Sequence, residues 1–487
     1  MRLRSVEEYL YVHATDTPEK AAVIVGEEET SYRSLYEKSY TYCSYLRKSG
    51  VSRGDIVVTR ACQELKYVVT YLAIHMAGGI VASVGKNTPL AEVDYVAKSL
   101  GAKYVLLKEG EDLLGPWENI YYYEAQELYP SLPLLDFPDT EDSADILFTT
   151  GTTGVSKGVE LSHRALIATA ENLIFGCGYR TDTFLVVPGP LNHANAIRKL
   201  FTTIVNGSTI SLLNGMSDMP GFFRALDYPL GTKACCLPPA AIRTIFALTK
   251  DKLGTYSEKI DFIESASAPL PESDKKRLCE LLPQTRLYNN YGSSESASVC
   301  MYDYSKYPDK KGCIGREMPN SRVIIVDDNH VEIDSDREHM GLIACIGDVN
   351  MKGYVNDPEL TNEVLKNGIV YTNDVGYKDA DGFIYISGRK GDVINVGGIK
   401  ISPSDVEEAA LALDEIDDCV CIAREDSITG QALKLLLVIH PGSTLDVRRI
   451  SEYLSSRLET IKVPRFYEQV EKIERTYNGK IDRKFYR

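Results

Sequence analysis

The sequence predicts a multidomain α/β protein, and three observations support this class. Segments with a helical hydrophobic period alternate with short apolar runs through the first 110 residues, which is typical of a sheet covered by helices. From Arg322 onward, alternating apolar residues and turns indicate a mainly antiparallel β subdomain. The chain of 487 residues is also too long for one hydrophobic core, which favours two to four domains or subdomains.

The N-terminal third contains the clearest alternation of helices and strands. We expect three strands here, at residues 21–26, 54–58 and 104–107. Helices are expected between them, at residues 34–46 and 65–76. Residues 115–142 contain four prolines and predict a loose connection.

The middle of the chain is organised around one turn-rich segment. Apolar runs at 146–148 and 159–161 enclose it and predict strand, loop, strand. Ser162 then suits the N-cap of a helix over residues 163–175. Further strands are expected at 184–187, 208–213 and 262–269, and a polar loop at 288–295.

Near Gly388 the character of the sequence changes. Residues 388–392 are charged and contain glycine, which indicates a hinge. A separate α/β unit of roughly 100 residues follows, a usual size for a small domain. Its expected elements are a helix at 404–413, strands at 419–423 and 435–440, and a helix at 445–458.

The turn-rich segment carries groups that bind phosphate. Its glycines let backbone N–H groups approach an anion, its hydroxyls donate to anion oxygens, and Lys157 adds a positive charge. The order of residues differs from the common P-loop, because Ser156 precedes the lysine and Gly158 follows it. The segment therefore predicts a phosphate site of another type.

Composition excludes several classes of function. The net charge of −15 and the lack of a basic run argue against a nucleic-acid binder and against an anionic membrane surface. No apolar run approaches the length of a membrane span, and the amino terminus lacks a signal-peptide core. The eleven cysteines contain no Cys-x-x-Cys pair, which favours reduced thiols in a cytoplasmic protein.

Six stretches in one order resemble the motifs of the adenylate-forming superfamily, which includes acyl-CoA synthetases, peptide-synthetase adenylation domains and luciferases. The stretches are FTTGTTGVSKG, PLNHANA, NNYGSSES, KGYVNDPELT, YTNDVGYKDADGFIYISGRKGD and TYNGKIDRK. The resemblance implies a large N-terminal domain of two helix-flanked sheets plus a β subdomain, and a small mobile C-terminal α/β domain. We expect the first at residues 1–388, with the β subdomain at about 320–388, and the second at 389–487.

This resemblance implies a reaction in two halves. A carboxylate is a poor electrophile, and joining it to AMP turns one oxygen into a phosphate leaving group. Carboxylate and ATP would give an acyl-adenylate and pyrophosphate, and the thiol of CoA would then attack. The implied small molecules are a carboxylic acid, ATP, Mg²⁺ and CoA. Because the transition-state charge is spread over several oxygens, catalysis would consist of positioning and electrostatics.

The nucleotide site follows from the resemblance, residue by residue. The phosphate loop would hold the β- and γ-phosphates, and Ser294 stands where the family usually has threonine. Glu295 would coordinate Mg²⁺, which prefers carboxylate oxygen. Tyr291 would stack on adenine, and Asn289 would hydrogen-bond its amino group. The implied set is Thr149, Thr150, Gly151, Thr152, Thr153, Gly154, Lys157, Ser267, Asn289, Tyr291, Gly292, Ser294, Asp374 and Arg389.

Ribose binding is implied for Asp374, helped by Arg389, although Asn373 stands where the family usually has glycine. Lys480 would bridge the substrate carboxylate and the adenylate phosphate, and His193 would gate the acyl pocket. Gly391 occupies the hinge position, which is usually Asp or Lys in the family. The implied catalytic residues are Lys480, Lys157, Glu295 and His193. The implied CoA-contacting residues, in a turn of the C-terminal domain, are Gly397, Gly398 and Lys400.

The acid and the thiol acceptor remain open at this stage. Residues 183–217 contain no Asp or Glu to pair with a substrate ammonium, which disfavours an α-amino acid. Ala194 follows His193 where an aryl-acid loader of the dihydroxybenzoate type would favour asparagine. A fatty or aromatic acid is left. We expect Arg198 and Lys199 on a solvated helix face, with contact to a second substrate carboxylate as the alternative.

Two other functional classes compete with a CoA ligase. A stand-alone adenylating enzyme would load a phosphopantetheinylated acyl or peptidyl carrier protein instead of CoA. A non-catalytic nucleotide-binding regulator is disfavoured because the charged residues of every motif are intact, namely Lys157, Glu295, Asp374, Arg389 and Lys480.

Overall fold

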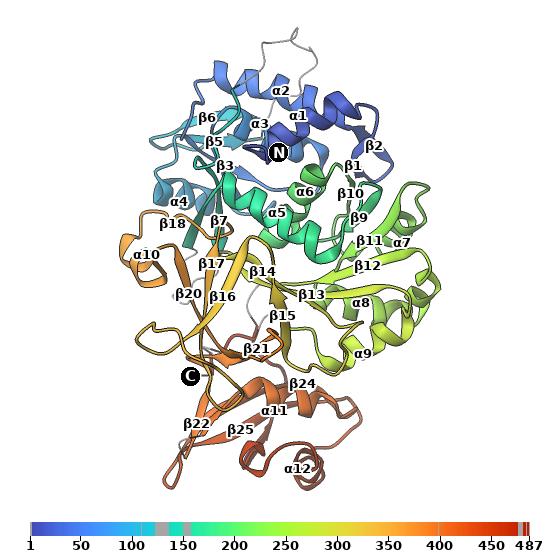
Figure 1. The fold of residues 1–487 in the computed structure, drawn as a ribbon, viewed down its shortest axis with the longest axis vertical. Helices are drawn as coiled ribbons and strands as arrows, with labels where there is room; N and C mark the ends of the chain where they lie inside the picture. Colours follow the sequence, from blue (N-terminus) through green and yellow to red (C-terminus); the bar gives the residue numbers. More distant parts are fainter. Residues whose placement is uncertain are drawn as a thin grey trace.

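The computed structural model describes residues 2–108, 110–121, 136–149, 157–397, 399–475, 481–483 and 485–486 (Figure 1). A large N-terminal domain, blue through yellow to light orange in Figure 1, lies above a small C-terminal domain in deeper orange and red. Both domains mix helices with sheets, so the predicted α/β class is confirmed.

The seven-stranded sheet of the N-terminal domain has a parallel centre and an antiparallel edge. Its order is β18 (Gly353–Tyr354), β8 (Lys157–Ser162), β7 (Ser143–Thr149), β4 (Ile80–Val84), β3 (Ile56–Arg60), β5 (Tyr104–Leu107) and β6 (Glu118–Tyr121). In the β7–β8 hairpin Thr149 lies opposite Lys157, which places both ends of the predicted phosphate loop at one end of this pair. The loose connection predicted for 115–142 was wrong at its start, because β6 extends the sheet beside β5.

The larger sheet has fourteen strands, which pair in parallel from β13 to β1 and antiparallel on either side of that half. Its order is β16 (Ser321–Val326), β17 (Gly341–Gly347), β20 (Ile369–Lys378), β21 (Ile384–Arg389), β15 (Cys313–Glu317), β14 (Ala297–Asp303), β13 (Arg286–Ser293), β12 (Ile260–Ser265), β11 (Thr232–Cys236), β9 (Thr183–Val187), β10 (Thr209–Leu212), β1 (Ala21–Val25) and β2 (Glu28–Ser31), with β19 (Leu365–Lys366) beside β20. Strand β13 pairs in parallel with β12 and antiparallel with β14, so it joins the parallel half to the β subdomain. The polar loop predicted at 288–295 was therefore wrong.

Helices cover these sheets and bury their apolar faces between them. They are α1 (Val6–Asp16), α2 (Tyr32–Lys48), α3 (Leu65–Met76), α4 (Leu90–Leu100), α5 (His163–Cys177), α6 (Ala194–Asn206), α7 (Met219–Asp227), α8 (Pro239–Thr249), α9 (Glu272–Leu281) and α10 (Pro358–Val364), with a 3₁₀ turn η1 (Lys252–Tyr256). The helices predicted at 34–46, 65–76 and 163–175 are confirmed. The predicted cap is confirmed too, because the Ser162 hydroxyl accepts a hydrogen bond from the Ala165 N–H at 3.2 Å.

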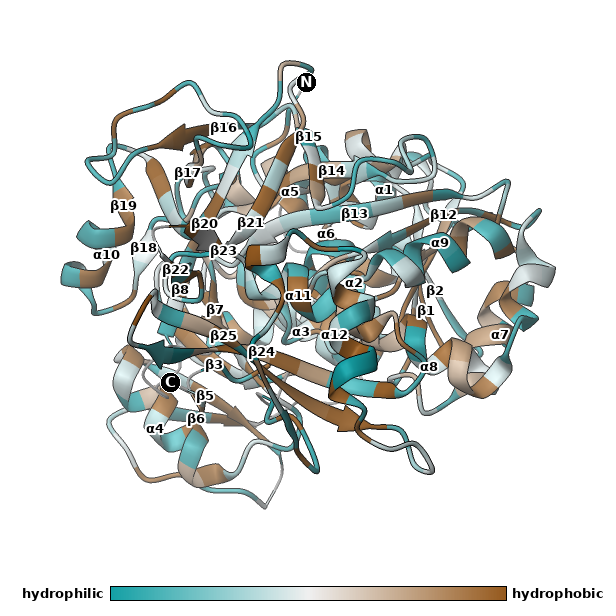
Figure 2. Ribbon diagram, turned by 90° about the horizontal axis from the view of Figure 1, so that it is seen from below, coloured by the Kyte–Doolittle hydropathy of each residue, from teal (hydrophilic) through white to brown (hydrophobic). Residues whose placement is uncertain are grey.

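The C-terminal domain has its own five-stranded sheet and core. The sheet consists of β22 (Ile394–Val396), β23 (Ile399–Ile401), β24 (Ile416–Asp426), β25 (Gly430–Ile439) and β26 (Phe466–Gln469), with helices α11 (Pro403–Leu411) and α12 (Val447–Ser455) and a 3₁₀ turn η2 (Thr460–Lys462). Figure 2 shows brown and teal alternating along α9, α11 and α12, as expected for helices with one buried face. The predicted helices of the C-terminal domain are confirmed as α11 and α12, and its predicted strands as β24 and β25.

Two exclusions from the sequence can be compared with the structure. Within the described ranges, no helix combines the length and the apolar character needed to cross a membrane. All eleven cysteines are free thiols.

Asn172 on α5 ties the helical layer to the β subdomain and is fully buried. Its side-chain amide donates to the Ser298 carbonyl at 2.9 Å and to the Ser321 hydroxyl at 3.2 Å. Its carbonyl accepts from the Asn320 N–H at 2.8 Å. One side chain therefore satisfies a buried backbone carbonyl and a backbone N–H from different segments.

Replacing this side chain tests the tie. We expect Asn172→Ala to lower the free energy of unfolding of the N-terminal domain by about 2–4 kcal/mol, because two backbone groups lose their partners. Urea denaturation followed by the fluorescence of Trp117, the one tryptophan of the chain, reports this domain. Asn206→Ala, which loses a more exposed bond to the Arg180 carbonyl, is the control and should change stability by less than about 1 kcal/mol. Equal effects of the two variants would contradict the assignment.

Candidate functional site

Three of the predicted site residues lie at the carboxyl ends of strands in the parallel half of the larger sheet. His193 follows β9, Ser267 follows β12, and Tyr291 lies on β13 beyond its last pairing with β12. In open α/β sheets, ligands bind outside the carboxyl ends of the strands. The topology therefore gathers residues that are up to about a hundred positions apart at one edge, where such a sheet binds its ligand.

Asp374 connects Tyr291 to Arg389. The Tyr291 hydroxyl donates to Asp374 Oδ2 at 2.7 Å, and the Arg389 Nε donates to Asp374 Oδ1 at 3.1 Å. Asp374 and Arg389 face each other across β20 and β21. Burial, followed by the nearby Asp374 carboxylate, raises the pKa of Tyr291 well above its usual value, so the phenol stays a donor. The carboxylate raises the pKa of Arg389 and keeps it charged.

Asn289 presents an unused acceptor beside this group. The residue is 9% exposed, and its Oδ1 is buried without a hydrogen-bond partner in the described part of the chain. On the next strand, Ser265 pairs with Asn289, and Ser267 two residues later has a positive φ of 78°. A buried acceptor without a partner fits an amino group such as that of adenine.

Tyr354 links the phosphate-loop lysine to Glu295, a link that the sequence analysis did not identify. The Tyr354 hydroxyl donates to Glu295 Oε1 at 2.7 Å. The Lys157 ammonium lies 5.9 Å from the centre of the Tyr354 ring. Tyr354 is on β18, which pairs with β8 at Val159, so the second sheet delivers both Lys157 and Tyr354. The only signal for Tyr354 was its place in the KGYVNDPELT motif.

The donor set around Glu295 fits a hard cation. The carboxylate is half-buried, and the backbone N–H of Glu295 is held by the Ser293 hydroxyl at 3.1 Å. One carboxylate oxygen is fixed by Tyr354, and among the described residues no lysine, arginine or histidine forms an ion pair with it. Mg²⁺ prefers such carboxylate oxygens. Gly292, three residues earlier, lets the backbones of β13 and β14 approach each other closely, because a Cβ there would lie 1.5 Å from the Ala297 carbonyl oxygen.

The solvated face predicted for Arg198 and Lys199 was wrong, because they are 8% and 1% exposed. Lys199 forms a 3.0 Å ion pair with the buried Glu264, so its ammonium group is held in the core. Burial alone would lower the pKa of Lys199, but Glu264 raises it above its usual value. Arg198 donates to the Ser294 carbonyl at 3.3 Å. Burial lowers its pKa to about 10, partly opposed by Glu295.

The structure also gives the positions of four other predicted residues in the fold. His193 occupies the N-cap position of α6. Gly391 lies between β21 and β22. Gly397 has a φ of 60° in the β22–β23 hairpin, and its N–H donates to the Thr429 carbonyl at 3.0 Å. The backbone of Lys400 pairs with Asn395 in this hairpin.

Several predicted residues lie outside the described ranges, so their roles stay predictions. They are Thr150, Gly151, Thr152, Thr153, Gly154, Gly398 and Lys480. For Thr149 and Lys400 only the backbone is described. A surface depression of about 760 Å³ lies beside α12 in the C-terminal domain and is lined by none of the predicted site residues. The candidate site is therefore defined by side-chain chemistry and not by this depression.

Comparison with known proteins identifies the family of the chain. The model of the AMP-binding enzyme family matches residues 10–355, and the model of the AMP-binding enzyme C-terminal domain matches residues 405–480. The chain belongs to the AMP-binding enzyme family. This confirms the resemblance to adenylate-forming enzymes that the six motifs indicated.

Individual members of this family are similar over the whole chain. A long-chain-fatty-acid–CoA ligase of Bacillus subtilis is 27% identical over 99% of this chain and 94% of its own length. Bacitracin synthase 3 of Bacillus licheniformis is 26% identical over 99% of this chain, which spans only 8% of that protein. Among solved structures, ATP-bound MatB from Rhodopseudomonas palustris superposes with a TM-score of 0.87, at 21% identity, covering 99% of this chain and 98% of that one. This last likeness supports the fold.

The Asp374 contacts predict how this AMP-binding enzyme depends on one carboxylate for AMP binding. Asp374→Asn removes the charge that holds Tyr291 and Arg389, and loses charge-assisted hydrogen bonds of about 1.5–3 kcal/mol. We expect the Kd for AMP, measured by calorimetry, to rise roughly 10- to 100-fold. The exposed Asp381→Asn is the control and should bind AMP as the unmodified chain does. Unchanged AMP affinity of a folded Asp374→Asn variant would refute the role.

Proposed function

We propose that this AMP-binding enzyme is an acyl-CoA synthetase that joins a fatty or aromatic carboxylic acid to CoA through an acyl-adenylate. The observation that carries the proposal is the Tyr354 link, which brings Lys157 and Glu295 to one place. A cation for phosphate oxygens beside a carboxylate for Mg²⁺ is what phosphoryl chemistry on ATP requires. Tyr291, Asp374 and Asn289 would form the nucleoside side of the same site.

Each residue has a defined task in this proposal. Tyr291 would stack on adenine, Asn289 would accept from its amino group, and Asp374 would bind the ribose hydroxyls. Lys157 would place positive charge against the phosphates, where negative charge develops. Glu295, oriented by Tyr354, would hold Mg²⁺. When bound, that ion would offset phosphate charge as a Lewis acid.

The C-terminal domain, whose boundary we propose at residues 388 and 389, would carry Lys480 to this site. The chain on both sides of Lys480 is fixed to that domain. Arg475 pairs with Asp418 on β24 at 2.7 Å, and Arg483 pairs with Glu407 on α11 at 2.7 Å. Motion about Gly391 would therefore move the lysine with its domain and exchange it for the β22–β23 hairpin, where CoA would bind.

One observation favours a second class of acid. Arg198 lies on α6, directly after the gate segment, and is buried without an ion-pair partner among the described residues. Glu295 and Asp145 act on this buried cation only from beyond ion-pair distance, and a second carboxylate on the substrate would pair with it directly. Dicarboxylic acids therefore form a second candidate class beside the fatty and aromatic acids.

The acid and the acceptor can be resolved in one experiment. Pyrophosphate release is measured over fatty, aromatic, dicarboxylic and amino acids, each with CoA, with a phosphopantetheinylated carrier protein or with neither. A CoA ligase turns over repeatedly only with CoA, and a carrier-loading enzyme only with the carrier protein. The absence of pyrophosphate and acyl-AMP with every acid, in a chain that binds ATP, would disprove the enzymatic proposal.

Lys480 gives a sharper prediction within this assay. Lys480→Ala removes one contact to the transition state, so adenylation should slow roughly 10²- to 10³-fold, as for a single oxyanion donor. Thioester formation from preformed acyl-adenylate should keep its rate, which single-turnover mixing with CoA measures. Lys472→Ala, an exposed lysine paired with Glu474 near the same segment, is the matched control. Wild-type adenylation by Lys480→Ala would remove this residue from the mechanism.

A further inference from the structure

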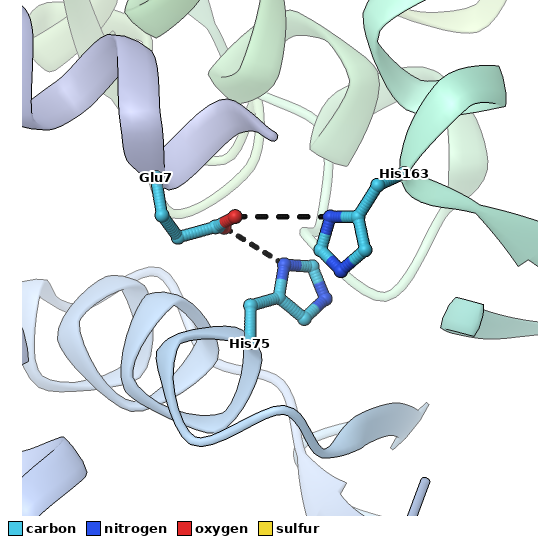
Figure 3. Close-up of side chains that lie close together, drawn as sticks. All are labelled: Glu7, His75 and His163. Carbon is cyan, nitrogen blue, oxygen red and sulfur yellow. Dashed lines mark hydrogen bonds and ion pairs between the residues drawn. The ribbon is translucent and has the colours of Figure 1, made fainter. Parts of the chain in front are cut away.

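Three polar side chains from distant parts of the sequence meet inside the N-terminal domain. Glu7 comes from α1, His75 from α3 and His163 from the first turn of α5. They are 0%, 0% and 1% exposed. Figure 3 shows both imidazole rings directed at the Glu7 carboxylate. None of the three belongs to the catalytic or nucleotide-binding residues proposed above.

The donor atoms have a spacing that suits one ion. Glu7 Oε1 lies 2.9 Å from His75 Nδ1, and Glu7 Oε2 lies 3.8 Å from His163 Nδ1 (Figure 3). One donor atom from each residue lies within 4.8 Å of the other two. Two donors that share a tetrahedral zinc ion at about 2.1 Å are roughly 3.4 Å apart. Small side-chain movements would therefore accommodate an ion between them.

Two of these buried atoms have no partner. Within the described chain, neither Glu7 Oε2 nor His163 Nδ1 forms a hydrogen bond. They face each other across 3.8 Å, which is too long for a hydrogen bond. Buried polar atoms without a partner are rare in native proteins, and an ion is one of the few ways to satisfy both.

The far side of His75 is arranged as in a metal-ligating histidine. Its Nε2 lies 3.1 Å from Asp145 Oδ1 and 3.1 Å from the Ala144 carbonyl oxygen. The Tyr71 hydroxyl donates to the same Asp145 oxygen. A carboxylate or carbonyl that accepts the second N–H fixes the ring and the tautomer of a ligand histidine. With its hydrogen on Nε2, His75 directs the lone pair of Nδ1 at Glu7.

Formal charge points in the same direction. Glu7 and Asp145 are two fully buried carboxylates in contact with one imidazole. If His75 alone were charged, these contacts would hold two carboxylates against one cation, and the buried Arg198 guanidinium is the further cation that acts on Asp145. A divalent cation with both imidazoles neutral would balance the two carboxylates, and a buried charge needs such compensation.

We propose that Glu7, His75 and His163 bind a structural zinc ion that joins α1 to α3 and α5. The Glu7 carboxylate and the two Nδ1 atoms supply three protein ligands. Carboxylate oxygen and imidazole nitrogen are both zinc ligands. Imidazole nitrogen favours zinc over Mg²⁺ or Ca²⁺, which take oxygen ligands. The full burial of Glu7, His75 and His163 keeps substrate away from the ion, so the ion serves the fold.

Metal analysis of the full chain tests the site. The protein is made without a histidine tag in zinc-supplemented medium, passed through gel filtration and analysed by mass spectrometry of metals. We expect about one zinc ion per chain. Glu7→Gln and His163→Asn should lose at least about nine-tenths of it, because each removes one ligand. His440→Asn, which alters an exposed histidine paired with Asp417 at 2.8 Å, is the matched control and should keep the metal.

Two results would overturn the site. One is a folded unmodified chain that holds less than about a tenth of an equivalent after exposure to zinc, which would make His75 an imidazolium bridging Glu7 and Asp145. The other is zinc retained in full by Glu7→Gln and His163→Asn. If these variants do not fold, X-ray absorption of the unmodified protein decides: a nitrogen and oxygen shell at about 2.0–2.1 Å supports the site, and a sulfur shell at about 2.3 Å places the ion on cysteines and refutes it.

Discussion

The carboxylate of Asp374 is the contact on which the candidate site depends. It receives the Tyr291 hydroxyl from β13 and the Arg389 side chain from β21, so it joins the central sheet to the strand that leads into the C-terminal domain. Strand β13 is also where the larger sheet changes from parallel to antiparallel pairing. One charged group therefore couples the position of Tyr291, the proposed adenine contact, to Arg389, two residues before the proposed hinge.

A second contact joins the two sheets of the N-terminal domain. Glu295 follows β13 of the larger sheet, whereas Tyr354 and Lys157 belong to strands of the smaller one. The Tyr354 hydroxyl closes the distance between them. Neither sheet alone carries all the residues that we propose for the nucleoside and the phosphates, so the proposed ATP site depends on the packing of the two sheets. The buried Asn172 tie reaches the same region, because it holds Ser298 on β14 and β14 pairs with β13.

Sequence reasoning recovered the elements whose side chains follow a simple period and missed those whose polar residues are buried by distant parts of the chain. Helix α3 and strand β5 could be predicted from the sequence because their apolar residues recur as expected for a buried helix and a buried strand. Strand β13 was missed because Asn289 and its neighbours place polar groups on a strand. The buried state of Lys199 was missed because its partner Glu264 is far along the chain and leaves no local pattern. The candidate site residues were predicted from the resemblance of the motifs. The contacts of Tyr354 with Glu295 and Lys157 could be identified only in the structure.

Gly391, the hinge that we propose, has a weak conformational preference of its own. Gly391 imposes little backbone restriction of its own, so the state of the C-terminal domain must be set by contacts on either side of it. Before the hinge, Asp374 holds Arg389. After it, Arg483 lies 3.7 Å from Asp392 and also pairs with Glu407. The glycine is thus flanked by an ion pair on each side, Asp374–Arg389 before it and Arg483–Glu407 after it. A rotation confined to the residues between these pairs would leave both intact, and it would have to break contacts between the domains such as the Arg337–Glu459 ion pair at 3.9 Å.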